Sequence, residues 1–144
     1  MKPPNEEISH KVKQWIDHAD EDLHLAEDVM TMRSRHGSPY RLIAYHSQQC
    51  AEKYLKAYLV WCGVDFPYTH NISILLELCG EHANWPAKLK DAEELSSYVI
   101  TTRYPGESEE VTKADAARAI EIAQQVRNQV RAGLKELGLK LPKQ

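Results

Sequence analysis

Apolar residues recur at steps of three and four along three long segments, which is the spacing of an amphipathic α-helix. The first such helix is predicted over about 5–32, with Asn5 as its N-cap and Glu6 and Glu7 in its first turn. One stripe of this helix is apolar and the remaining positions are rich in Asp and Glu. We expect the apolar stripe to be buried and the acidic face to be solvated.

The second long helix is predicted over 38–61, with Ser38 as its N-cap and Pro39 at its first helical position. The third is predicted to open at Thr112, because an Asp three residues later completes the pattern of a capping box. Gly138 marks its end.

Two shorter helices are predicted over about 72–79 and 86–99, and Asn71 stands where the first of them would be capped. No segment shows the strict alternation of a β-strand, and there is no internal repeat. Short links between long helices favour antiparallel neighbours. The sequence therefore predicts an all-α, up-and-down bundle of about five helices in a single domain, residues 1–144.

The two faces of the 38–61 helix differ in character. At about 100° per residue, one broad arc is apolar and forms the predicted core face: Ile43, Cys50, Ala51, Tyr54, Leu55, Tyr58 and Trp61. Nearly opposite lie four polar residues, which we call the polar stripe: His46, Gln49, Lys53 and Lys56. This stripe can be a solvated face, a ligand site, or a surface that pairs with a second subunit or lies under another helix.

The net charge of -3 gives no general attraction to nucleic acid, so such binding would need a local basic patch. The three cysteines, Cys50, Cys62 and Cys79, form no CxxC pair, which is typical of apolar roles in a reducing compartment. No segment approaches the ~20 apolar residues that span a membrane, and the first residues do not resemble a signal peptide. We expect a cytoplasmic protein.

Metal chemistry is disfavoured by the positions of the candidate ligands. A di-iron bundle carries Glu-x-x-His on two separate helices, whereas Glu7-x-x-His10 and Glu21-x-x-His24 lie on the same predicted helix. Zinc spacings, a phosphate-binding glycine loop and a serine nucleophile motif are absent. We expect no metal and no cofactor.

One pair of residues that could catalyse a reaction without a metal ion remains. Arg41 can hold a phosphate, and His46 can act as a general acid or base, which together is the chemistry of a ribonuclease. The two residues are five positions apart, or about 140° around a regular helix. They would meet only if Arg41 reached around the helix or if a second subunit supplied one of them.

The segment 45–57, YHSQQCAEKYLKA, resembles the signature helix of HEPN domains, the higher eukaryote and prokaryote nucleotide-binding domains. Parts of 15–26 resemble the first helix of that family. The segment 69–72 resembles the entry to its third helix, and 103–105 its loop before the last helix. The resemblance covers nearly the whole chain.

This resemblance implies an all-α bundle that is commonly homodimeric and often encoded beside a minimal nucleotidyltransferase, as in toxin–antitoxin pairs. Ribonuclease members carry an Arg followed by a His toward the last helix. Arg103 and Arg127 lack a His at that spacing, and Arg41 lies on another helix without a polar residue after it. The resemblance therefore implies the non-catalytic, binding branch. The site positions that it implies are His46, Gln49, Glu52 and Lys53, followed by His70 and Tyr104.

Three hypotheses follow. The first is a nucleotide- or RNA-associated binding module, acting as a homodimer with a nucleotidyltransferase partner, in which Lys53 meets a phosphate and Tyr104 stacks on a base. The second is a metal-independent ribonuclease toxin that uses Arg41 and His46. The third is a dimeric interaction bundle without a ligand, in which His46 and Gln49 are satisfied hydrogen-bonding residues.

Overall fold

A computed structural model describes residues 5–32, 35–99 and 110–142. These ranges contain five helices: α1 (Glu6–Thr31), α2 (Tyr40–Trp61), α3 (Ile72–Gly80), the 3-10 helix η1 (Ala87–Tyr98) and α4 (Lys113–Glu136). They contain no strand, so the all-α prediction is confirmed. Within the described ranges, no helix combines the length and the apolarity needed to cross a bilayer.

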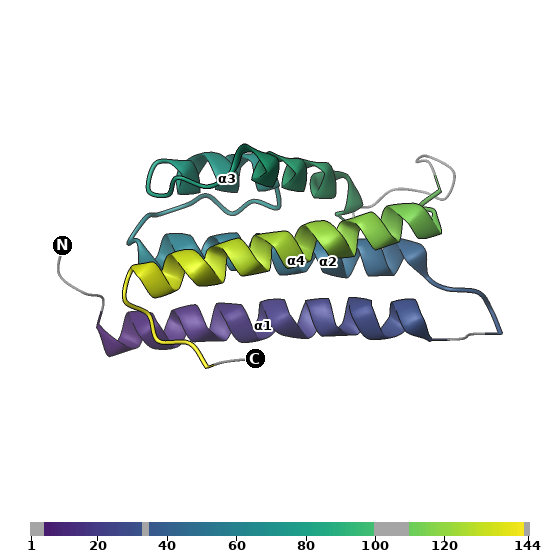
Figure 1. Cartoon of the computed structure of the whole chain (residues 1–144), viewed down its shortest axis with the longest axis horizontal. Helices are drawn as coiled ribbons and strands as arrows, with labels where there is room; N and C mark the ends of the chain where they lie inside the picture. Colours follow the sequence, from purple (N-terminus) through teal and green to yellow (C-terminus); the bar gives the residue numbers. More distant parts are fainter. Residues whose placement is uncertain (1–4, 33–34, 100–109, 143–144) are drawn as a thin grey trace.

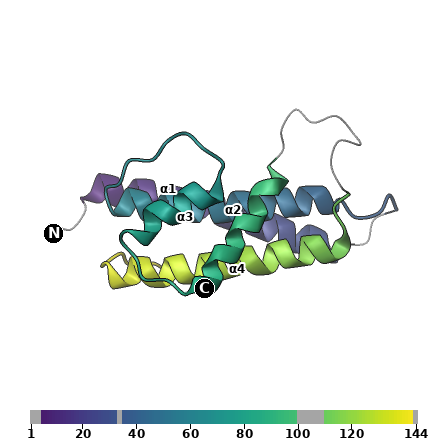
Figure 2. The ribbon, with the colours of Figure 1, turned by 90° about the horizontal axis from the view of Figure 1, so that it is seen from above.

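The three long helices lie side by side, and α3 with η1 forms a second layer over α2 (Figure 1). α1 runs antiparallel to α2, whereas α4 runs in the same direction as α2. The hydrogen bond from Trp61 Nε1 to the Leu137 carbonyl, 3.2 Å long, joins the C-terminal ends of α2 and α4. This direction is possible because α3 and η1 carry the chain back toward the start of α2, with η1 crossing the long helices obliquely (Figure 2).

α2 is the central helix of the molecule. Fifteen of its 22 residues are buried, so it is enclosed on more than the single face that an amphipathic helix hides. All seven residues of the predicted core face are buried. α4 crosses α2 closely at Gly133, where an added Cβ would lie 3.2 Å from the Tyr58 ring.

Most predicted helix ends are confirmed by their hydrogen bonds. The Asn5 side chain accepts from the Ile8 amide, and Asn71 accepts from the amide of the residue two positions on. Thr112 and Asp115 make both bonds of a capping box. Gly138 follows α4 with a φ of 95°, a conformation that favours glycine.

The predicted Ser38 cap is wrong. α2 begins at Tyr40 after Pro39, and no side chain caps it. The Tyr40 amide donates instead to the Ser38 carbonyl, 2.9 Å away, so this serine contributes its backbone rather than its hydroxyl.

The segment predicted as a helix over 86–99 is the 3-10 helix η1. Its buried residues, Leu89, Ala92 and Leu95, are spaced at steps of three. A 3-10 helix has three residues per turn, so this spacing places all three side chains on one line toward the core.

Candidate functional site

The polar stripe of α2 meets α1 rather than water alone. Asp22 of α1 lies between two of its members: the His46 ring nitrogen Nδ1 is 2.8 Å from Asp22 Oδ1, and Lys53 Nζ is 2.5 Å from Asp22 Oδ2. His46 and Lys53 are seven residues, or two helical turns, apart and therefore share a face of α2. We call Asp22, His46 and Lys53 the outer cluster.

The outer cluster is partly accessible, with side-chain exposures of 28% for His46, 23% for Lys53 and 12% for Asp22. When His46 donates from Nδ1 to Asp22, Nε2 is the ring nitrogen left for a ligand. The Lys53 ammonium has three donors, and Asp22 takes one of them. A single carboxylate therefore orients two groups that can donate to an anion.

The remaining stripe residues, Gln49 and Lys56, belong to an inner cluster that also includes Gln48, Glu52 and His70. The Glu52 carboxylate is only 4% exposed, and it accepts from Gln48 Nε2 at 3.0 Å and from Lys56 Nζ at 3.1 Å. The His70 ring nitrogen Nδ1 lies 2.8 Å from the same carboxylate. This cluster ties the chain after α2 to α2 itself, because Gln48 also donates to the His70 carbonyl.

Three predicted site residues, Gln49, Glu52 and His70, are therefore engaged in the fold. Gln49 is buried and donates to Gln48 Oε1 at 2.7 Å. Glu52 compensates the buried Lys56 ammonium, which also lies over the rings of Trp15 and Phe66. His70 braces Glu52, whereas the adjacent Asn71 caps α3 by itself.

The expectation that the acidic face of the first helix is solvated is wrong for three residues. Asp22 belongs to the outer cluster, and Glu27 accepts from Gln124 Nε2 at 2.8 Å. Asp20 accepts from the Tyr54 hydroxyl and from Arg127 Nε, the latter at 2.9 Å. Burial and the hydrogen bond to Asp20 raise the pKa of the Tyr54 hydroxyl, which therefore stays protonated.

Sequence reasoning missed Asp20 and Asp22. The available signal was their position, since both lie beside the buried stripe residues Ala19 and Leu23 of α1. A charged residue at the border of a buried stripe is within reach of the neighbouring helix, where it needs a partner.

The other predicted residues lie elsewhere. Arg41 is exposed in the first turn of α2 and is not among the polar partners of His46. Tyr104 lies outside the described residues. In the part of the chain that the structure describes, no three His, Cys, Asp or Glu side chains are grouped to hold a metal ion.

The sequence pattern of the HEPN domain matches residues 12–133. The chain belongs to the HEPN domain family. It is 34% identical over 146 aligned positions to "Putative toxin MJ1304" of Methanocaldococcus jannaschii, with 89% of this chain and 91% of that protein covered.

Two solved structures are similar to this HEPN fold. ST0689, an archaeal HEPN homologue, is 32% identical with a TM-score of 0.67, covering 85% of this chain and 96% of its own. TT1696 from Thermus thermophilus is 26% identical with a TM-score of 0.72, covering 85% and 97%. The resemblance carried by segment 45–57 is thereby confirmed.

Proposed function

We propose that this HEPN chain is a member of a toxin–antitoxin pair and binds a nucleotide or RNA through the outer cluster. The observation that carries the proposal is the meeting of His46 and Lys53 at Asp22, with both side chains still accessible. The family and the similarity to a protein named as a toxin support the biological class. The inner cluster serves the fold, which narrows the ligand-facing residues of the polar stripe to two.

A phosphate would be bound by charge-assisted hydrogen bonds. Lys53 has donors beyond the one that Asp22 takes, and a protonated His46 donates from Nε2. Asp22 holds both groups before the ligand arrives, so less side-chain freedom is lost on binding. With His46 protonated, His46 and Lys53 carry two positive charges against the single negative charge of Asp22. The outer cluster would then have a net positive charge that attracts an anion.

The ribonuclease alternative finds less support in the geometry. Arg41 and His46 are about 140° apart around one α-helix, and His46 is oriented by Asp22. A second subunit would have to bring an arginine to His46 for cleavage. We therefore assign His46 to binding.

The homodimer and the minimal nucleotidyltransferase partner remain part of this proposal. A protein partner can cover the exposed apolar side chains of Leu25 on α1, Met32 directly after α1, and Leu42 on α2. Expression of the chain is expected to arrest growth, and co-expression of a minimal nucleotidyltransferase is expected to relieve the arrest. Growth unaffected by the chain, or arrest that persists with the partner, would contradict the pairing.

Calorimetric titration tests the ligand directly. ATP and a short RNA are titrated into the unchanged protein and into Lys53→Gln and Arg41→Gln variants. Loss of one charged hydrogen bond predicts about tenfold or more weaker binding by Lys53→Gln, and unchanged binding by Arg41→Gln. If neither ligand gives a measurable heat of binding, or if the Lys53→Gln variant and the unchanged protein have equal affinities, the proposal is contradicted.

A further inference from the structure

A groove of about 570 Å³ lies between α3 and η1, in the layer that covers α2. The residues that line it recur at steps of three and four, so each helix turns one face toward the groove. They are Ser73, Leu76, Glu77 and Gly80 of α3, Leu89, Lys90 and Glu93 of η1, and residues 83–87 where the chain passes from one helix to the other. The Ile72 amide donates to Ser96 Oγ at 3.1 Å, which joins the start of α3 to the end of η1.

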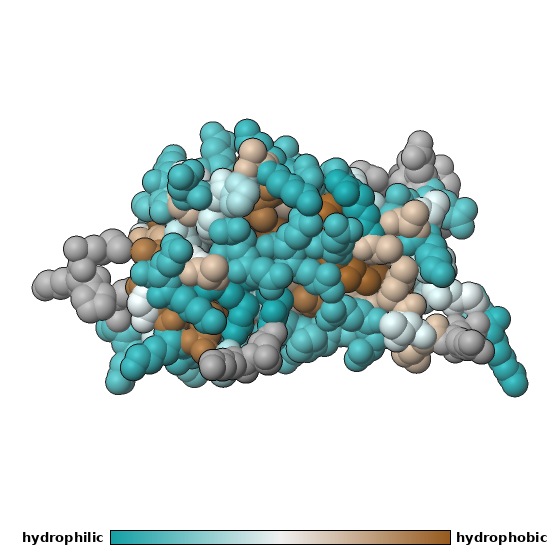
Figure 3. Space-filling view, viewed as in Figure 1, coloured by the Kyte–Doolittle hydropathy of each residue, from teal (hydrophilic) through white to brown (hydrophobic). Residues whose placement is uncertain are grey.

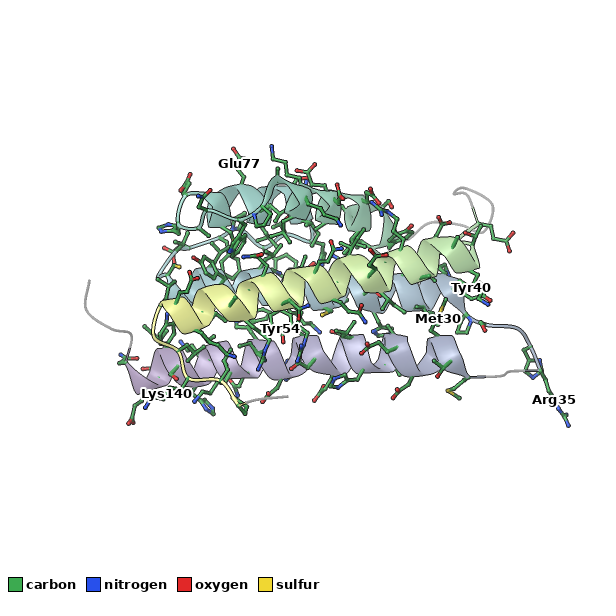
Figure 4. The ribbon with its side chains drawn as sticks, in the orientation of Figure 1. Met30, Arg35, Tyr40, Tyr54, Glu77 and Lys140 are labelled. Atoms are coloured by element: carbon green, nitrogen blue, oxygen red, sulfur yellow. The ribbon has the colours of Figure 1, made fainter. Side chains whose placement is uncertain are left out.

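The two ends of the groove differ in chemistry. The end at 83–87 is mainly apolar, with Ala83, Trp85, Pro86 and Ala87. Toward the other end lie Glu77, Lys90 and Glu93, so two carboxylates face one ammonium and the lining has an excess negative charge. Figure 4 shows Glu77 on the side of α3 that faces away from α2 and α4. Neither Glu77 nor Glu93 has an ion-pair partner among the residues that the structure describes.

Trp85 is held in place from behind. Its ring packs edge-on against Tyr58, with ring centroids 4.8 Å apart, and α4 approaches it at Gly133. An added Cβ at Gly133 would lie 3.5 Å from the indole nitrogen of Trp85. The half-buried indole therefore offers the groove an apolar surface that loses little side-chain freedom when a ligand covers it.

Gly80 leaves the groove open although the backbone does not require a glycine there. Gly37, Gly63 and Gly138 have positive φ angles, and Gly133 is constrained by the close approach of α2. Gly80 has no positive φ, and an added Cβ would meet nothing within 4 Å. A glycine inside a helix costs stability relative to alanine. The missing side chain therefore serves the open space of the groove rather than the helix.

We infer that this groove binds a short linear segment of a protein partner, with an apolar side chain against Trp85 and a Lys or Arg near Glu77 and Glu93. An apolar anchor in a pocket with charges at its rim is the usual anatomy of a protein interface. Glu77 and Gly80 are three residues apart, or ~4.5 Å along α3. An extended segment rises ~3.3 Å per residue, so the cation stands one or two positions from the apolar residue.

The groove is separate from the outer cluster. The outer cluster joins α1 to α2, whereas the groove belongs to the layer on the other side of α2 (Figure 1). The inference therefore does not depend on the ligand proposed for His46 and Lys53, and peptide binding is expected to be unchanged in Lys53→Gln.

Selection from a phage-displayed library of random peptides tests the groove. The library is first depleted on Gly80→Leu, whose added side chain fills the open space, and is then selected on the unchanged protein. Enriched peptides are expected to carry Leu, Met or Phe one or two positions from Lys or Arg. They are expected to bind Gly80→Leu about tenfold or more weakly, because an apolar side chain can no longer be buried there. No enrichment after depletion, or enrichment of acidic peptides, would overturn the inference.

Glu77→Gln keeps the test decisive if Gly80→Leu does not fold, because Glu77 is exposed. The affinity of peptides selected on the unchanged protein is expected to fall about two- to fivefold in this variant, the effect of one exposed charge. Glu81→Gln is the matched control, since Glu81 is exposed four residues further along and does not line the groove. Equal affinities of the two variants would contradict the inference.

The position of a bound peptide can be read from the indole signals of the three tryptophans by NMR spectroscopy. Trp85→Phe identifies the signal that belongs to the groove. A selected peptide is expected to shift the Trp85 signal more than those of Trp15 and Trp61. A Trp85 signal that stays in place at saturating peptide would locate the binding elsewhere and reject the groove as the site.

Discussion

Asp20 and Asp22 show how two residues of one type, two positions apart, acquire different roles. The turn of α1 directs Asp20 toward Tyr54 and Arg127, and Asp22 toward His46 and Lys53. In each case one carboxylate compensates more than one donor on a neighbouring helix. Asp20 faces Arg127 and Arg131, whose side chains are only 12% and 10% exposed, so its removal has the larger consequence for stability.

We predict that Asp20→Asn lowers the free energy of unfolding by about 3–5 kcal/mol, because it leaves the largely buried side chains of Arg127 and Arg131 without their charge partner. Urea denaturation followed by tryptophan fluorescence measures this change. Glu21→Gln is the matched control, since Glu21 is exposed on the same helix, and its effect is expected within about 0.5 kcal/mol. Equal denaturation midpoints for the two variants would contradict the role given to Asp20.

The cysteines provide a second prediction. Burial raises the pKa of all three thiols, and Cys50 and Cys79 are fully buried whereas Cys62 is partly exposed. A raised pKa leaves less thiolate at a given pH, and the thiolate is the reactive form. A disulfide reagent at mildly alkaline pH is expected to label Cys62 first, and the other two only after denaturant is added. Loss of the fast reaction in Cys62→Ser checks the assignment, and fast labelling that persists in that variant would contradict it.

At the scale of the elements, sequence alone predicts what local signals encode. The caps at Asn5 and Thr112 each depend on residues within one turn, and the structure contains both. The pattern over 86–99 predicts a helix but not its 3-10 form, because apolar steps of three over 12 residues fit both helix types. Ser38 carries the residue type of a cap without its geometry.

The two helix starts can be compared by experiment. Thr112→Ala removes the side-chain bond to the Asp115 amide and is expected to lower stability by about 1 kcal/mol. Ser38→Ala removes a hydroxyl that caps nothing, and its cost is expected to stay within about 0.5 kcal/mol. Thermal or urea denaturation of both variants measures the difference. A larger loss for Ser38→Ala than for Thr112→Ala would reverse this account of the helix ends.

The candidate site was likewise predictable only where its residues follow a local pattern. Periodicity and the family resemblance select His46 and Lys53, because they lie on one face of one helix. Their partner Asp22 lies on another helix. Such contacts depend on how helices pack together, which a single sequence does not encode in any local pattern.

For the whole molecule, the enclosure of α2 decides how its polar residues are used. Amphipathic analysis assumes one buried face, but α1, α4 and the α3–η1 layer surround this helix, so its polar stripe is divided between the outer and inner clusters. The face drawn in Figure 3 is largely hydrophilic, with hydrophobic residues visible mainly in furrows between the elements. Polar groups within the bundle therefore specify how the helices fit together, as well as offering a ligand site at its edge.

A substitution at Gln49 can distinguish a role of the polar stripe within one chain from a role in an interface between subunits. Its amide is buried and bonded to Gln48 within the same chain, so Gln49→Ala is expected to lower stability by about 1–3 kcal/mol. We predict that the variant keeps the oligomeric state of the unchanged protein, measured by light scattering after size-exclusion chromatography. A change of that state at equal concentration would favour the interaction-bundle hypothesis instead.

The most direct test of the central claim observes the ligand at His46 itself. The protein has seven histidines, and NMR spectroscopy resolves their imidazole signals, with His46→Gln identifying the one in the outer cluster. On addition of ATP or a short RNA, the His46 signal is predicted to shift in the unchanged protein, and to shift much less in Lys53→Gln at the same ligand concentration. A stationary His46 signal at saturating ligand, or cleavage of the RNA that is lost in Arg41→Gln, would contradict the assignment of this site to binding.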